Sequence, residues 1–164
     1  MTSIGILSDT HLLSCSNDFL QRVSKAFNNC DIIIHAGDLT DIAILQAFTG
    51  KKVVAVHGNM CNPTTQRALP KQQTLIVDGY TIGICHGAGN RDNIEDRMLD
   101  LFPEADCIVY GHTHRSVCHF IGTTLLINPG SFQSTGRYGA QGTYALLEIT
   151  ENGLHGAIYD LPLW

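Results

Sequence analysis

The chain has 164 residues, a length that suits one globular domain spanning 1–164. Hydrophobic residues make up 44% of it and charged residues 15%, which excludes an intrinsically disordered chain. The net charge is −5 and no run of basic residues occurs, so general binding to nucleic acid or to anionic membranes is not expected. No apolar stretch approaches the ~20 residues of a transmembrane helix.

The six cysteines do not resemble a disulfide framework. None forms a Cys-x-x-Cys pair, and several lie inside apolar runs. The first residues also lack the basic region of a signal peptide. We therefore expect reduced thiols and a cytoplasmic location, with disulfides in an oxidising compartment as the less favoured alternative.

The first half of the chain alternates between strand and helix patterns. A buried strand is expected over 2–7, and a polar loop then leads to a helix that Asn17 or Asp18 would cap and that ends near Phe27. The alternation continues with a strand over 31–35, a helix from about 41 to 48 and a strand over 52–57. A polar stretch without a predicted element follows to Gln73.

The second half changes to hairpins. Asp78-Gly79 is a strong turn signal between strands over 74–77 and 80–85. A helix over about 91–102 and a strand over 106–110 follow, and the remaining short β-like runs cover 117–120, 124–128, 143–149 and 155–161. The whole pattern predicts an α/β fold. Its sheets would be parallel at the centre with antiparallel strands added, in two packed layers with helices outside.

Five of the predicted strands end in a short polar motif. The motifs are Asp9-x-His11, Gly37-Asp38, Gly58-Asn59, His86-Gly87 and Gly111-His112-x-His114. The carboxyl ends of strands in an open α/β sheet form its ligand-binding edge, so we expect the motifs to converge there. We also expect His112 and His114 to face the same way, because residues two apart in an extended segment do so.

The converging side chains are two carboxylates, one amide and four imidazoles. Such oxygen and nitrogen donors suit Mn, Fe, Zn or Ni better than Mg or Ca. Seven ligands are too many for one ion but fit two ions that share a carboxylate. A hydrolase with a single metal ion is the poorer alternative for so rich a set.

In this order, the five motifs resemble those of the calcineurin-like metallophosphoesterase superfamily. The short chain and its Asn128-Pro129-Gly130-Ser131 segment are similar to the small YfcE-type phosphodiesterase branch. The resemblance implies a β-sandwich of two mixed sheets flanked by helices. It also implies that one metal ion is held by Asp9, His11, Asp38 and His114, and a second by Asp38, Asn59, His86 and His112, with Asp38 bridging.

The same resemblance implies a metal-dependent phosphodiesterase that acts on small phosphodiesters. Two divalent ions, Mn before Ni, Fe, Zn or Mg, would hold a hydroxide that attacks phosphorus in line, without a covalent intermediate. Asn59 would be both a catalytic and a substrate-binding residue, because its carbonyl can bind metal while its NH₂ donates to a phosphate oxygen. A homo-oligomer would also fit this branch.

One motif departs from the family pattern. Many relatives carry a histidine after the Gly-Asn pair, where it protonates the leaving group, and YfcE-type relatives often carry Cys-Asp. This chain has Met60, which cannot donate a proton, followed by Cys61. We therefore predict a preference for diesters or aryl esters with acidic leaving groups over alkyl monoesters.

Several alternatives remain open at this stage. His35 and His57 are either ordinary strand-end residues or orient a metal ligand. Cys61 is either a loop thiol or a site residue, and Arg91 and Arg115 either face solvent or contact phosphate. A scaffold or binding module is the alternative function, since the retromer subunit that is similar to this branch is a scaffold with a degraded metal site. The complete set of seven ligands favours the enzyme.

Overall fold

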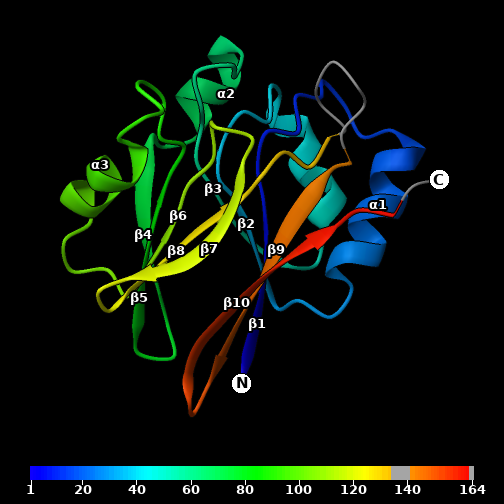
Figure 1. Ribbon diagram of the computed structural model, residues 1–164. Coiled ribbons are helices and arrows are strands. Elements are labelled where there is room, and N and C mark those ends of the chain that lie inside the picture. Colours follow the sequence, from blue (N-terminus) through cyan, green and yellow to red (C-terminus); the bar gives the residue numbers. More distant parts are fainter. Residues whose placement is uncertain (134–140, 163–164) are drawn as a thin grey trace.

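The computed structural model describes residues 1–133 and 141–162, and its strands form two five-stranded sheets (Figure 1). The first sheet contains β1 (Thr2–Leu7), β2 (Ile32–His35), β3 (Lys52–Ala55), β9 (Thr143–Thr150) and β10 (Gly153–Asp160), in the order β10-β9-β1-β2-β3. The second contains β4 (Gln72–Val77), β5 (Tyr80–Cys85), β6 (Cys107–Val109), β7 (Ser116–Ile121) and β8 (Thr124–Pro129), in the order β4-β5-β6-β8-β7.

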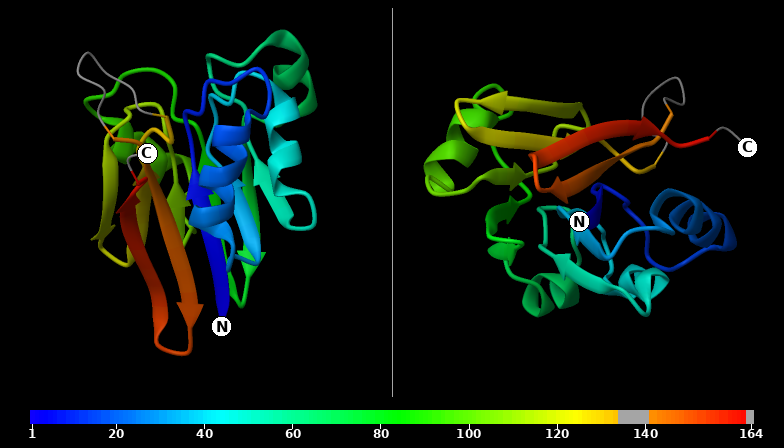
Figure 2. Two further views of the ribbon diagram at one scale, coloured as in Figure 1. Left: turned by 90° about the vertical axis from the view of Figure 1, so that its right-hand side faces the viewer. Right: turned by 90° about the horizontal axis from the view of Figure 1, so that it is seen from below.

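Each sheet has a parallel part and an antiparallel part. Strands β1, β2 and β3 are parallel, as are β5, β6 and β8. Antiparallel strands are added as β9 and β10 in the first sheet and as β4 and β7 at the two edges of the second. The two sheets lie face to face, with helices on the outside (Figure 2). The predicted two-layer β-sandwich of mixed sheets is therefore confirmed.

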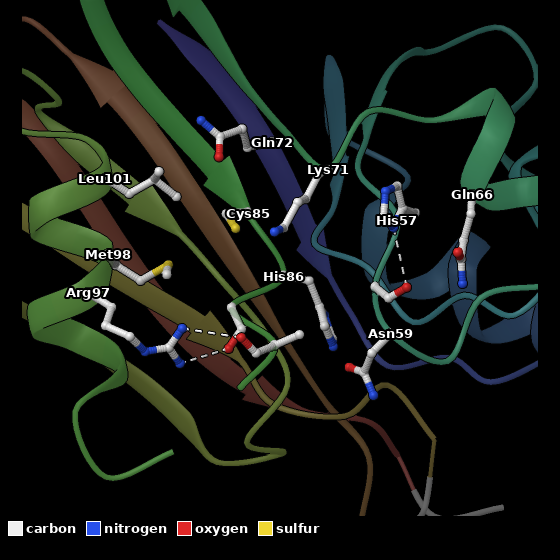
Figure 3. A pocket seen from close by; sticks show the side chains of 13 residues that line it. His57, Asn59, Gln66, Lys71, Gln72, Cys85, His86, Arg97, Met98 and Leu101 are labelled. Carbon is white, nitrogen blue, oxygen red and sulfur yellow. Dashed lines mark hydrogen bonds between the residues drawn. The ribbon is translucent and has the colours of Figure 1, made fainter. Parts of the chain in front are cut away.

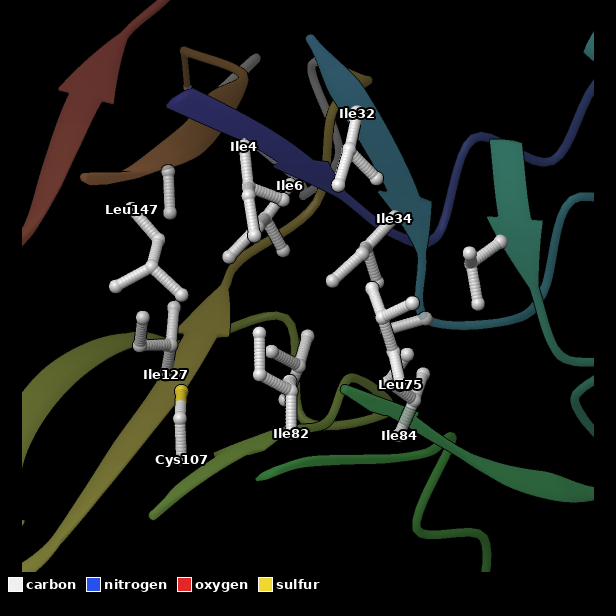
Figure 4. Close-up of a cluster of buried hydrophobic side chains, with 14 of the residues drawn as sticks. Ile4, Ile6, Ile32, Ile34, Leu75, Ile82, Ile84, Cys107, Ile127 and Leu147 are labelled. Atoms are coloured by element: carbon white, nitrogen blue, oxygen red, sulfur yellow. The ribbon is translucent and has the colours of Figure 1, made fainter. Parts of the chain in front are cut away.

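The main hydrophobic core lies between the two sheets (Figure 4). Alternate residues of the strands point into it, and the others point toward the helices, as the period of two in a strand requires. The first sheet contributes Ile4, Ile6, Ile32, Ile34 and Leu147, and the second contributes Leu75, Ile82, Ile84, Cys107 and Ile127. Most of these side chains are β-branched, which suits a pleated surface buried on both faces.

The helices cover the outer faces of the sandwich. Helix α1 (Asn17–Phe27) and the 3₁₀ helix η1 (Ile42–Phe48) pack against Leu7 and Ile33 of the first sheet. Helix α3 (Ile94–Leu101) packs against Ile108 and Leu126 of the second. No helix among residues 1–133 and 141–162 is long and apolar enough to cross a membrane.

Some predicted boundaries of the helices are wrong. Ser16, not Asn17 or Asp18, caps α1, because its side chain accepts a hydrogen bond from the Phe19 N–H. The segment that starts after Asp41 forms a 3₁₀ helix, although its apolar spacing also fits an α-helix. Helix α2 (Pro63–Ala68) is not predicted by the sequence pattern. It has six residues, of which only Thr65 is buried, so it has no apolar period to detect.

Candidate metal centre

The loops that carry the five motifs all follow strands at one end of the sandwich. Those after β1, β2 and β3 carry Asp9, Asp38 and Asn59 and belong to the first sheet. Those after β5 and β6 carry His86 and the 111–114 turn and belong to the second. The parallel strands therefore bring motifs from both sheets to one place, as the sequence predicts.

One group of potential metal ligands consists of Asp9, His11 and His114. Their ligand atoms all lie within 4.8 Å of one another. Asp9 Oδ1 is 3.2 Å from Nε2 of His114 and 3.7 Å from Nε2 of His11. The carboxylate is fully buried, whereas the two imidazoles are partly exposed, so this group is open to solvent on the histidine side.

A second group consists of Asp9, Asp38 and His86, and all three residues are buried. Nε2 of His86 is 3.0 Å from Asp38 Oδ2 and 4.0 Å from Asp9 Oδ1. Asp9 thus belongs to both groups. The resemblance instead implies a bridging Asp38, and that assignment stays a prediction.

The other polar atoms of Asp9, Asp38 and His86 form hydrogen bonds within the protein. Asp9 Oδ2 accepts hydrogen bonds from the Ser8 hydroxyl at 2.7 Å and from the His112 N–H at 3.2 Å. Asp38 Oδ1 accepts one from the Met60 N–H at 2.7 Å. His86 Nδ1 lies 2.8 Å from the Ala36 carbonyl, to which it donates, so in the neutral ring Nε2 carries the lone pair that can bind a metal.

This arrangement fits a metal ion. Asp9 Oδ1 and His86 Nε2 are buried and make no well-directed hydrogen bond within the described part of the chain, although facing carboxylate and imidazole atoms lie 3.0–4.0 Å from them. Unpaired polar atoms of this kind are costly in a protein interior unless an ion or water satisfies them. The donors are oxygen and nitrogen, as Mn, Fe, Zn and Ni prefer.

The backbone at the site is unusual. Five of the seven predicted ligands have a left-handed backbone, with φ of 54° at Asp9, 49° at His11, 53° at Asp38, 70° at His112 and 60° at His114. Such values are uncommon outside glycine and often mark functional sites. They also correct one expectation: His112 and His114 lie in a tight turn after β6, not in an extended segment, and their rings reach different groups.

The site's electrostatics keep the acids ionised. Burial alone would raise the pKa of Asp9, but the imidazoles of His11, His114 and His86 beside it lower that pKa below its usual value. Burial opposes ionisation of Asp38 too, and the adjacent His86 lowers the pKa of Asp38. Ionised carboxylates are the form that binds a divalent cation.

The structure places the last two predicted ligands, His112 and Asn59, beside the second group. The His112 ring lies 5.3 Å from the His86 ring between centroids, and its Nε2 is 3.0 Å from the Gly89 carbonyl. Its Nδ1 is therefore the nitrogen left for a metal. Asn59 is exposed and lines the same cavity as His86 (Figure 3).

Several supporting residues could not be found from motifs alone. Asn128 donates to the Gly111 carbonyl at 2.9 Å, and the Ser131 hydroxyl donates to the Asp9 carbonyl at 3.0 Å. The 128–131 segment therefore holds two of the ligand-bearing turns in place. Arg97 holds the loop after His86 by donating to three backbone carbonyls.

Two open alternatives now have structural answers. His35 is fully buried, with its ring nitrogens 3.0 Å from the Thr10 hydroxyl and 3.2 Å from the Gly37 N–H, so it orients the first two ligand loops. Cys61 is buried, and its Sγ accepts the Gly58 N–H at 3.3 Å. Cys61 is therefore a loop thiol that stabilises the turn at residues 58–61.

Comparisons with known proteins relate this chain to phosphoesterases. The calcineurin-like phosphoesterase superfamily domain matches residues 2–152. A probable metallophosphoesterase of Methanocaldococcus jannaschii is 37% identical over 132 residues, which cover 78% of this chain and 67% of that protein. A phosphodiesterase of the same organism is 28% identical over 148 residues, 77% of this chain and 82% of that protein.

The fold also has close structural neighbours. The crystal structure of Vps29 with Zn²⁺ from Entamoeba histolytica has a TM-score of 0.70 and 18% identity, and the match covers 97% of this chain and 99% of that one. At this identity the similarity shows the fold alone. The match over residues 2–152 and the 37% identical relative show the family, whose members bind divalent metals. The chain belongs to the calcineurin-like phosphoesterase superfamily and is a phosphoesterase.

Proposed function

We propose that this phosphoesterase hydrolyses small phosphodiesters with two divalent metal ions. The observation that carries the proposal is the convergence of buried carboxylates and imidazoles in two ligand groups, where Asp9 Oδ1 and His86 Nε2 are buried without a well-directed hydrogen bond. Their arrangement calls for positive charge at the end of the sandwich where the two groups meet. We assign Asp9, His11 and His114 to one ion, and His86, His112 and Asn59 to the other, with Asp38 between them.

The residues of the chain have distinct tasks in this proposal. When bound, the two ions activate water as the nucleophile and offset the negative charge on the phosphoryl oxygens. Asn59 donates a hydrogen bond from its NH₂ to a phosphoryl oxygen and so orients the diester. Water supplies a hydroxyl to phosphorus while one P–O ester bond breaks, and the proton ends on the departing oxygen.

Neither residue that follows Asn59 can supply that last proton. Met60 is 59% exposed and has no acidic proton, and the Cys61 thiol is buried in its turn. We infer that solvent protonates the leaving group, which favours leaving groups that are stable as anions. This supports the preference for aryl esters over alkyl monoesters.

The test is hydrolysis of bis(4-nitrophenyl) phosphate by chelator-treated protein, alone and with Mn²⁺, Ni²⁺, Fe²⁺, Zn²⁺ or Mg²⁺. We expect activity only with added metal, highest with Mn²⁺, and a loss of at least about 100-fold in Asp38→Asn. Asp18→Asn is the matched control, because Asp18 pairs with Arg22 on the surface of α1. Hydrolysis that persists without metal and in Asp38→Asn would refute the proposal.

The same assay separates the enzyme from a scaffold. A scaffold has no need for two ligand groups with buried carboxylates, so we favour the enzyme. Metal binding without turnover of any aryl diester would instead support the scaffold.

The six cysteines are all free, which supports a reducing, cytoplasmic location.

A further inference from the structure

A cavity of about 390 Å³ begins at the predicted ligands Asn59 and His86 and extends toward α3 (Figure 3). This volume is within the ~300–1,000 Å³ range of small-molecule sites. The cavity has an apolar wall made by Cys85, Met98 and Leu101. A substrate whose phosphorus lies at the metal centre would therefore have room here for one of its ester groups.

The charge of this cavity is opposite to that of the protein. The whole chain carries a net charge of −5, but the described residues that line the cavity include Lys71 and Arg97 and no Asp or Glu. Walls of low dielectric strengthen the field of cations in such a cleft. An anionic ligand is thus favoured beyond what the metal ions alone provide.

The two cations differ in what they can still bind. Arg97 donates to the carbonyls of Gly87, Ala88 and Asn90 at 3.1, 3.2 and 2.5 Å, so its guanidinium is already used to hold the loop. Lys71 makes no hydrogen bond or ion pair within residues 1–133 and 141–162. Its side chain is directed toward the cavity (Figure 3).

The backbone around Lys71 is fixed on both sides. The Pro70 carbonyl accepts the His57 N–H at 3.0 Å, and the Gln73 side chain donates to the Ala55 carbonyl at 2.7 Å. Both contacts join the start of β4, in the second sheet, to the end of β3, in the first. The Lys71 side chain therefore reaches the cavity from an ordered segment of the backbone.

We propose that this cavity binds one ester group of the phosphodiester and that Lys71 selects ester groups that carry a second anion, a carboxylate or a further phosphate. The inference rests on the proposed phosphodiesterase function and names its substrate class. The apolar wall contacts the carbon skeleton of the ester group, and Lys71 pairs with its terminal charge.

The test uses two matched substrates, 4-nitrophenyl butyl phosphate and 4-nitrophenyl 3-carboxypropyl phosphate. Both release 4-nitrophenolate, so they differ only in the terminal carboxylate. We expect Lys71→Met to lower the ratio of their kcat/KM values, charged over neutral, about fivefold, as for an ion pair worth ~1 kcal/mol. Lys71→Arg should keep the ratio. Lys52→Met, which removes the same charge at the far end of β3, is the control and should also keep it.

A second measurement detects binding without turnover. The methionine methyl signals of the Zn²⁺-loaded protein are followed by NMR during titration with O-butyl or O-(3-carboxypropyl) methylphosphonate. Met98 lines the cavity and its signal should shift, whereas Met1, which is 92% exposed at the opposite end of β1, should not. The carboxylated probe should bind about fivefold more tightly to the wild type than to Lys71→Met.

The outcomes separate the two proposals. If both esters are hydrolysed and the ratio of their kcat/KM values is equal in the wild type and Lys71→Met, the inference is overturned. The proposed phosphodiesterase function is then unaffected. No hydrolysis of either ester would overturn the proposed function. In that case the inference would also be overturned if the Met98 signal responded equally to both probes and equally in the wild type and Lys71→Met.

Discussion

Gly58→Ala should damage the metal centre without altering any predicted ligand. A Cβ atom at position 58 would lie 2.1 Å from Asp38 Oδ1, 2.7 Å from the Asp38 backbone nitrogen and 2.7 Å from His86 Cδ2. The backbone cannot yield easily, so the Asp38 carboxylate must move by roughly 1 Å to restore a normal contact. Such a movement strains the hydrogen bond from the Met60 N–H and separates Asp38 from His86.

The size of the effect follows from these contacts. A hydrogen bond to a charged group contributes about 1.5–3 kcal/mol, so we expect Gly58→Ala to lower the free energy of unfolding by about 2 kcal/mol. Displaced ligands should also weaken Mn²⁺ binding by about 10- to 100-fold. The assays are urea denaturation and calorimetric titration of chelator-treated protein with Mn²⁺.

Gly5→Ala is the matched control. Its Cβ would lie 2.4 Å from the Phe27 ring, in the packing between the first sheet and α1. It should cost about 1–3 kcal/mol of stability through overpacking but leave Mn²⁺ affinity at the wild-type value. The reasoning would be refuted by Gly58→Ala protein that binds Mn²⁺ as tightly as the wild type, or by equal losses of affinity in both variants.

Three further outcomes are expected. Arg97→Met removes three hydrogen bonds from the loop after β5, so it should weaken Mn²⁺ binding about tenfold in the same titration, and unchanged affinity would contradict this. Tyr110→Phe removes a 2.8 Å hydrogen bond to the Glu95 carboxylate and should lower the urea-derived free energy of unfolding by about 1 kcal/mol, with metal affinity kept. Burial lowers the pKa of His35 to about 3, so below pH 6.5 the unfolded chain binds this proton more readily than the folded one. Stability should therefore fall as pH drops from 6.5 toward 3, by up to ~1.4 kcal/mol per pH unit, and His35→Gln should show a shallower dependence in urea denaturation at pH 7 and 5.5.

The fold could be predicted because its strands are unambiguous. The isoleucines at 32–34 of β2, for example, are apolar, β-branched and bounded by polar segments, and the strand is buried on both faces. The polar helix α2 could not be predicted, because it depends on an Asn62 cap and a proline at its first turn, not on an apolar face. A capping asparagine or a proline also occurs in many loops, so these residues alone do not identify a helix.

The candidate site could be predicted in part. The motif order implied that strand ends would bring the ligands together, and the structure brings Asp9, His11, His114, Asp38 and His86 into two groups. The left-handed turn at 111–114 could not be foreseen, because non-glycine residues rarely adopt it. The role of Ser131 depends on a contact with Asp9 across 122 positions, which no local pattern encodes.

Both ligand groups draw on both sheets, and this has a consequence for the life of the protein in a cell. Asp9, His11 and Asp38 follow strands of one sheet, while His86 and His114 follow strands of the other. An ion in either group would therefore join the two layers of the sandwich and bind the folded chain far better than the unfolded one. Metal supply would then set how many molecules survive proteolysis, in addition to how fast each one works. Scarcity of the ion would lower the abundance of the protein itself.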